Sequence, residues 1–152
     1  MKKKEIKAAL EALRPIKPQR IADEAIREAI LGNTLSLLSA QRQYEQDAKD
    51  LERAHLGGWE KERADLAQLR ASLQREPDRE KRAELQAKID SYGELFDVIR
   101  EFNKRVLALG EETAPVTPMD RDAFIKQMQT QEYDLGMIID LSPLFDTKQP
   151  TP

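Results

Sequence analysis

Apolar side chains recur at steps of three and four residues along most of this chain, and that spacing is the strongest constraint on its fold. Such steps place side chains on one face of an α-helix. One seam crosses the Gly57-Gly58 pair without losing phase. Its members are Leu37, Ala40, Tyr44, Ala48, Leu51, His55, Trp59, Glu62, Leu66, Leu69 and Leu73. The seam predicts a long helix over residues 18–76, continuous but softened, with room for kinks at 32–34 and 57–58.

A second apolar stripe follows Pro77, a residue suited to opening a new helix after a sharp reversal. The stripe consists of Leu85, Ile89, Tyr92, Leu95, Phe96, Ile99, Phe102, Val106 and Leu109. It stops at Gly110, a residue type favoured just beyond a helix end. Folding the chain back at Pro77 places Trp59 opposite Phe96, and apolar residues face each other along the whole length. The two stripes therefore predict an antiparallel pair in which residues 77–110 form the return helix.

Shorter segments flank this pair. Residues 1–14 predict a short basic helix, residues 111–117 a linker, and residues 118–152 a short helix followed by an apolar tail. Thr117 is suited to cap that last helix, with Pro118 at its first position. The predicted fold is all-α: a long antiparallel helical hairpin, coiled-coil-like, with short N- and C-terminal helices packed at its base.

Composition agrees with amphipathic helices and excludes several function classes. Charged residues make up 35% of the chain and aromatic residues 5%, and there are no cysteines. Disulfides, thiolate catalysis and cysteine zinc sites are thereby excluded. No apolar run approaches the roughly 18 residues of a membrane span. Lysines 2–4 resemble the start of a signal peptide, but Glu5 and Lys7 interrupt the apolar region that would have to follow. We therefore expect a cytoplasmic protein.

The most aliphatic segment, residues 21–43, extends past the end of the predicted return helix. Leaving its leucines and isoleucines in water would be costly, because burying each contributes about 1.5–3 kcal/mol. Either the terminal segments or a second subunit must cover this surface, and we expect a homo-oligomer, most simply a dimer. The predicted oligomer or partner face comprises Ile26, Ile30, Leu31, Leu35, Leu37 and Leu38.

The N-terminal residues are strongly basic, although the chain as a whole has a net charge of -3. The candidate phosphate contacts are Lys2, Lys3, Lys4, Lys7, Arg14, Lys17 and Arg20. Such an arm would give salt-sensitive, sequence-independent nucleic-acid binding. No aromatic residues are interleaved for base stacking, so this function is the alternative rather than the first choice.

The C-terminal region holds large apolar residues on an acidic background. The candidate docking residues are Ile138, Ile139, Leu141, Leu144 and Phe145. A tail of this kind either packs on its own chain or enters a groove of another protein. We favour self-docking because the aliphatic part of the predicted bundle offers a complementary surface.

Catalytic chemistry has little support. Glu52 and His55 have the Glu-x-x-His spacing of di-iron carboxylate bundles, but His55 is the only histidine and could complete a metal site only in a symmetric dimer. No nucleophile turn and no glycine-rich phosphate loop occurs. We expect no enzyme and no cofactor. The sequence predicts a non-enzymatic oligomeric interaction, scaffolding or adaptor protein. The alternative is a nucleic-acid-associated protein, for example of phage or mobile-element type, that uses the basic N-terminal arm.

Overall fold

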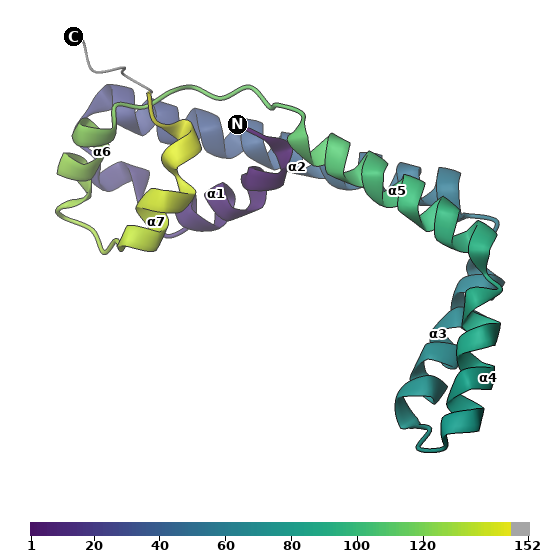
Figure 1. Cartoon of the computed structure of the whole chain (residues 1–152). Coiled ribbons are helices and arrows are strands. Elements are labelled where there is room, and N and C mark those ends of the chain that lie inside the picture. The colour runs from purple at the N-terminus through teal and green to yellow at the C-terminus, as the bar shows by residue number, and fades with distance from the viewer. Residues whose placement is uncertain (147–152) are drawn as a thin grey trace, which may run out of the picture. The chain divides into compact units, whose positions relative to one another are not determined.

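A computed structural model describes residues 1–146 of the chain, and the fold is all-α. No β-strand forms among these residues beyond two isolated bridges. The α-helices are α1 Ile6–Leu13, α2 Glu24–Leu56, α3 Glu60–Arg75, α4 Arg79–Asp90, α5 Gly93–Glu111, α6 Arg121–Met128 and α7 Leu135–Asp140 (Figure 1). Short 3-10 turns form at Lys3–Glu5, Pro18–Arg20 and Ser142–Leu144. The chain divides into two compact units: unit 1 holds residues 1–46 and those from 109 onward, and unit 2 holds residues 47–108.

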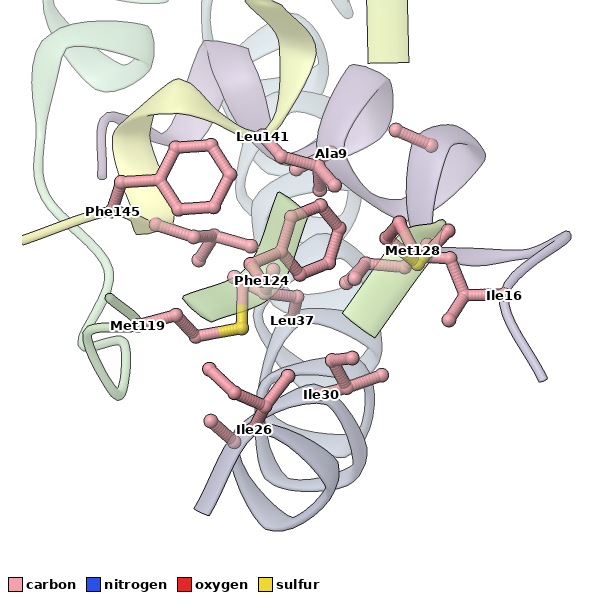
Figure 2. Packing of buried hydrophobic residues seen from close by; sticks show 14 of the residues in the cluster. Ala9, Ile16, Ile26, Ile30, Leu37, Met119, Phe124, Met128, Leu141 and Phe145 are labelled. Atoms are coloured by element: carbon pink, nitrogen blue, oxygen red, sulfur yellow. The ribbon is translucent and has the colours of Figure 1, made fainter. Parts of the chain in front are cut away.

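Unit 1 is built around the first half of α2. Helices α1, α6 and α7 gather around it (Figure 1), and their inward side chains form one apolar cluster. Figure 2 shows Phe124 of α6 near the centre of this cluster, with Leu37 of α2 and Leu141 close by. The buried members are Ile6, Ala9, Ala12, Leu13, Ile16, Ile21, Ile26, Ala29, Ile30, Leu37, Ala114, Met119, Phe124, Met128, Leu141, Leu144 and Phe145. Segments from both ends of the chain therefore share one core.

Polar groups fix where α2 begins and what crosses it. The Asp23 carboxylate accepts a hydrogen bond from the Ile26 N–H and caps the helix. The side-chain oxygen of Gln127 accepts bonds from the Ala22 and Asp23 N–H groups, which ties α6 to the same end. Asn33 is fully buried, and its amide donates to the Thr117 carbonyl and accepts from the Thr117 N–H. The segment after α5 is thus held to the middle of α2.

Unit 2 contains the end of α2, then α3, α4 and most of α5. Helices α3 and α4 pack side by side and are joined by residues 76–78 (Figure 1). Asp78 caps α4 by accepting a hydrogen bond from the Lys81 N–H. The buried cluster here is small: Leu66, Ile89 and Leu95, with Trp59, Leu69, Leu73, Tyr92, Phe96 and Ile99 packed against it.

The continuous helix predicted over 18–76 is wrong, because the chain leaves helical conformation at residues 57–59. The seam keeps its phase across that break, so periodicity alone could not reveal it. The predicted return helix 77–110 is also interrupted, at residues 91–92, and forms α4 and α5. The segment over 32–34 remains within α2. This segment, where the sequence allowed a kink, contains Asn33, whose buried amide bonds the backbone of Thr117.

The start of α6 and the end of α5 also differ from the sequence prediction. Asp120 caps α6 by accepting a bond from the Ala123 N–H, so the cap predicted at Thr117 is wrong. The backbone N–H and carbonyl of Thr117 bond the Asn33 amide, and α6 begins only at Arg121. Helix α5 continues through Gly110 to Glu111. A Cβ at Gly110 would lie 3.2 Å from the Tyr44 hydroxyl oxygen, so this glycine permits a close approach rather than ending the helix.

Candidate interaction surface

The oligomer face predicted from the sequence separates into a buried set and an exposed set on different sides of α2. Ile26, Ile30 and Leu37 point into the core of unit 1 and are at most 4% exposed. The other three form a row on the outer side, where Leu31 is 48%, Leu35 70% and Leu38 43% exposed. We call Leu31, Leu35 and Leu38 the α2 leucine face. The inclusion of Ile26, Ile30 and Leu37 in an intermolecular face was wrong, because the terminal helices cover them.

A groove lies at the edge of this face, between α1 and α2. Its volume is about 380 Å³, and most of its lining surface is apolar. Leu10 of α1 and Leu38 of α2 form its apolar walls, together with Thr34. Lys7, Glu11 and Arg14 complete the lining from α1. The α2 leucine face therefore continues into a hollow that an apolar side chain can enter.

The first lysines of the predicted basic arm are engaged within unit 1. The Lys2 Nζ lies 2.6 Å from a carboxylate oxygen of Glu111, and the Lys3 Nζ lies 2.6 Å from one of Glu112. Lys4 forms a further ion pair with Glu111. Backbone bonds join the same two segments: the Lys3 N–H donates to the Glu112 carbonyl, and the Ala114 N–H donates to the Met1 carbonyl. We call this contact of residues 1–4 with residues 111–114 the N-terminal clasp.

The clasp shifts the ionisation of its central carboxyl group. Hydrogen bonds from the Lys2 and Lys4 ammonium groups lower the pKa of Glu111 from 4.5 to about 2. The hydrogen bond between Lys2 and Glu111 also raises the pKa of Lys2. Glu111 and Glu112 belong to the acidic C-terminal part of the sequence, whose charge is opposite to that of the basic N-terminal residues, but the charge pattern alone does not tell which acid pairs with which lysine.

The remaining candidate phosphate contacts are spread over separate segments. Lys7 and Arg14 line the groove on α1, and their side chains are exposed. Lys17 is exposed as well, while its backbone N–H and carbonyl bond the side chain of Gln131. Arg20 closes the 3-10 turn before α2. Lys2, Lys3 and Lys4 are thus paired with carboxylates, whereas Lys7, Arg14 and Lys17 are exposed.

The predicted docking tail packs on its own chain. Leu141 and Leu144 are fully buried in the core of unit 1, and Phe145 stacks at a tilt on Phe124 with ring centroids 5.4 Å apart (Figure 2). The Met119 N–H donates to the Leu144 carbonyl, which ties the tail to the segment before α6. Ile138 is half-buried, and Ile139 remains 60% exposed.

Glu52 and His55 do not gather further metal ligands. The Glu52 carboxylate lies 3.5 Å from a guanidinium nitrogen of Arg63. The His55 ring is half-buried and lies 6.5 Å from the Phe102 ring, measured between centroids. Among residues 1–146, no group of three or more histidine, aspartate or glutamate side chains is placed to hold a metal ion.

Two further hollows lie in unit 2. One, of about 410 Å³, is lined by residues of α3 and of the α4–α5 region, among them Asp65, Lys88 and Tyr92. The other, of about 310 Å³, lies at the break between α2 and α3 and is lined largely by charged side chains.

None of the helices in the described part of the chain is long and apolar enough to cross a lipid bilayer.

Two charged residues stand at the ends of the α2 leucine face, and the sequence prediction of that face did not include them. Glu28 precedes Leu31 by three residues, and Arg42 follows Leu38 by four, so both continue the same helical row. Both side chains are exposed. Their helical spacing is visible in the sequence, but the predicted face comprised apolar residues only.

Comparison of the chain with protein-family models, with curated proteins and with solved structures finds no match to any of them.

Proposed function

We propose that this chain is a non-enzymatic helical interaction protein, of the scaffolding or adaptor type, that self-associates through the α2 leucine face. One observation carries the proposal. Leu31, Leu35 and Leu38 lie in a row on the outer side of a helix whose inner side is fully engaged in a core. A row of exposed leucines beside an apolar groove is typical of surfaces that bind another helix.

The free energy of burying apolar side chains also favours self-association through this face. Burial of a leucine contributes about 1.5–3 kcal/mol relative to leaving it exposed, so three adjacent leucines offer a substantial gain. Because Ile26, Ile30 and Leu37 already fix α2 in the core of unit 1, binding of a partner requires little further ordering of this helix. In this proposal, unit 2 is an antiparallel, coiled-coil-like helical pair that presents charged surface rather than a reaction centre.

The alternative, a nucleic-acid-associated protein, has less support. Its strongest candidates, Lys2, Lys3 and Lys4, form ion pairs with Glu111 and Glu112 in the N-terminal clasp. The alternative predicts retardation of a DNA or RNA fragment at low salt that is lost at high salt. Absence of retardation at low salt would eliminate it.

Molecular mass in solution, measured by light scattering over a wide range of protein concentration, tests the self-association proposal. We expect a mass above that of one chain at high concentration, falling on dilution. Leu35→Lys should remove the association because it places a charge at the centre of the face. Leu107→Lys is the matched control, since Leu107 is 72% exposed but lies in unit 2. A monomer at every concentration, or an association that Leu35→Lys leaves intact, would contradict the proposal.

A further inference from the structure

The row of residues along the outer side of α2 has a particular charge order. Glu28, Leu31, Leu35, Leu38 and Arg42 follow one another at steps of three, four, three and four residues. These steps keep all five on one helical face. An acid therefore stands at the N-terminal end of the leucines and a base at the C-terminal end.

Neither end charge has a partner within the described chain. Among residues 1–146, Glu28 and Arg42 form no ion pair and no side-chain hydrogen bond, and both are exposed. In the same unit, Lys2 and Glu111 pair with each other. The two ends of the leucine row are thus open to charges supplied from outside.

We propose that the occupant of the α2 leucine face is a second copy of this chain, with its α2 antiparallel to the first. Glu28 of each copy then pairs with Arg42 of the other. The inference rests on the proposed function and adds the identity and the orientation of the partner. It follows from the symmetry of the row, because Glu28 and Arg42 lie equally far from Leu35, seven residues to each side.

An antiparallel two-fold axis at Leu35 brings every member of the row opposite a suitable residue. Leu35 meets Leu35 of the second copy, Glu28 comes level with Arg42, and Leu31 lies within one residue, about 1.5 Å along the axis, of the level of Leu38. The two ion pairs are about 21 Å apart along the helix, at 1.5 Å per residue. A parallel arrangement would instead place Glu28 against Glu28 and Arg42 against Arg42, which like charges disfavour.

The groove between α1 and α2 fits the same arrangement. Its walls include Leu10 and Leu38, so it opens beside the row at the level where the second copy's leucines lie. By symmetry each copy offers one groove to the other. An isologous contact of this kind closes on itself and gives a dimer rather than a filament.

Charge exchange at the two ends of the row tests the orientation, read as the dimer dissociation constant from sedimentation equilibrium of the full chain. Glu28→Arg alone and Arg42→Glu alone should each weaken the dimer about tenfold, because two symmetry-related pairs turn from attraction to repulsion. The double variant Glu28→Arg with Arg42→Glu should restore it. An equimolar mixture of the two single variants should also associate, since both of its mixed pairs carry opposite charges.

Glu84→Arg is the matched control, because Glu84 is exposed on α4 in unit 2 and the change in net charge is the same. If single exchanges leave the dissociation constant unchanged while Leu35→Lys still abolishes the dimer, the antiparallel inference is overturned and the proposed function stands. If the wild-type chain is a monomer throughout, both fail. Weakening by single exchanges without rescue in the double variant also overturns the inference.

Discussion

The two units of this protein bury apolar surface in different ways. Unit 1 collects side chains from α1, α2, α6 and α7 around Phe124, and segments from both ends of the sequence meet there (Figure 2). Unit 2 buries a narrow seam whose fully enclosed members are Leu66, Ile89 and Leu95. Both units are helical, yet only unit 1 has a core with neighbours on several sides.

This difference bears on what each unit can do. In unit 1 the buried contacts on the inner side of α2 stabilise the helix, so its outer side can carry exposed leucines. In unit 2 the partly buried Leu69 and Leu73 complete the seam itself. A helix with one engaged side and one free apolar side suits binding, whereas a paired seam suits a stable, charged rod.

Truncating one central residue in each unit should give the largest effects and should separate the two. Phe124→Ala removes a fully buried ring and should cost about 3–5 kcal/mol of unfolding free energy. Leu66→Ala should cost about 2–3 kcal/mol, because the half-exposed residues beside it let the site collapse. Denaturant unfolding followed by circular dichroism measures both changes.

The single tryptophan, Trp59, lies in unit 2 and allows a second reading of the same experiment. Leu66→Ala should shift the tryptophan fluorescence transition more than Phe124→Ala does. A fluorescence shift for Phe124→Ala as large as or larger than that for Leu66→Ala would mean that the two units unfold in one cooperative transition.

The loss of unfolding free energy caused by Asn33→Ala should be the next largest. The substitution leaves the N–H and carbonyl of Thr117 without the buried amide that satisfies them, at a cost of about 1–3 kcal/mol. Ser39→Ala, at an exposed position further along α2, is the control and should change the free energy of unfolding little. A cost for Asn33→Ala no larger than that of the control would show that the amide does not anchor the linker.

The glycine pair at the break after α2 should respond unequally to alanine. A Cβ at Gly57 would lie 2.3 Å from the Arg53 carbonyl oxygen, so Gly57→Ala should destabilise by about 1–3 kcal/mol. No atom lies within 4 Å of a Cβ at Gly58, so Gly58→Ala should be neutral or stabilise by up to about 1 kcal/mol. Thermal unfolding of the two variants compares them directly. Stabilisation by both would support the continuous helix that the sequence predicted.

The N-terminal clasp should give the smallest effect, and it should depend on pH. The pKa of Glu111 is lowered in the folded chain from 4.5 to about 2, so its contribution is present above pH 4.5 and is lost as the pH falls toward 2. Glu111→Gln should reduce that loss, and high salt should weaken the clasp because its ion pairs are exposed. Unfolding measured from pH 6 to pH 2 tests this. An unchanged pH profile in Glu111→Gln would contradict it.

The sequence predicted helices well and their interruptions poorly. Periodicity placed Trp59 opposite Phe96, and both pack against the buried cluster of unit 2. It could not detect the break at residues 57–59, because a turn of suitable length preserves the phase of the seam. The steric demand at Gly57 arises from the backbone geometry of that turn, which spacing does not encode.

The candidate surface was half predicted, for a related reason. Helical spacing identified the aliphatic part of α2, but it could not tell Leu37, which faces the core, from Leu38, which faces outward. That distinction depends on where α1 and α6 pack. The pairing of Lys2 with Glu111 likewise depends on tertiary contact between distant segments.

Amide hydrogen exchange of the wild-type chain, compared between dilute and concentrated solutions, tests the central claim most directly. The claim is that the free side of α2 in unit 1, and not the seam of unit 2, is where a second copy binds. We predict added protection at high concentration in residues 28–42 of α2 and in the neighbouring α1, with α3 and α4 unchanged. Added protection confined to α3 and α4, or no concentration dependence at all, would contradict it.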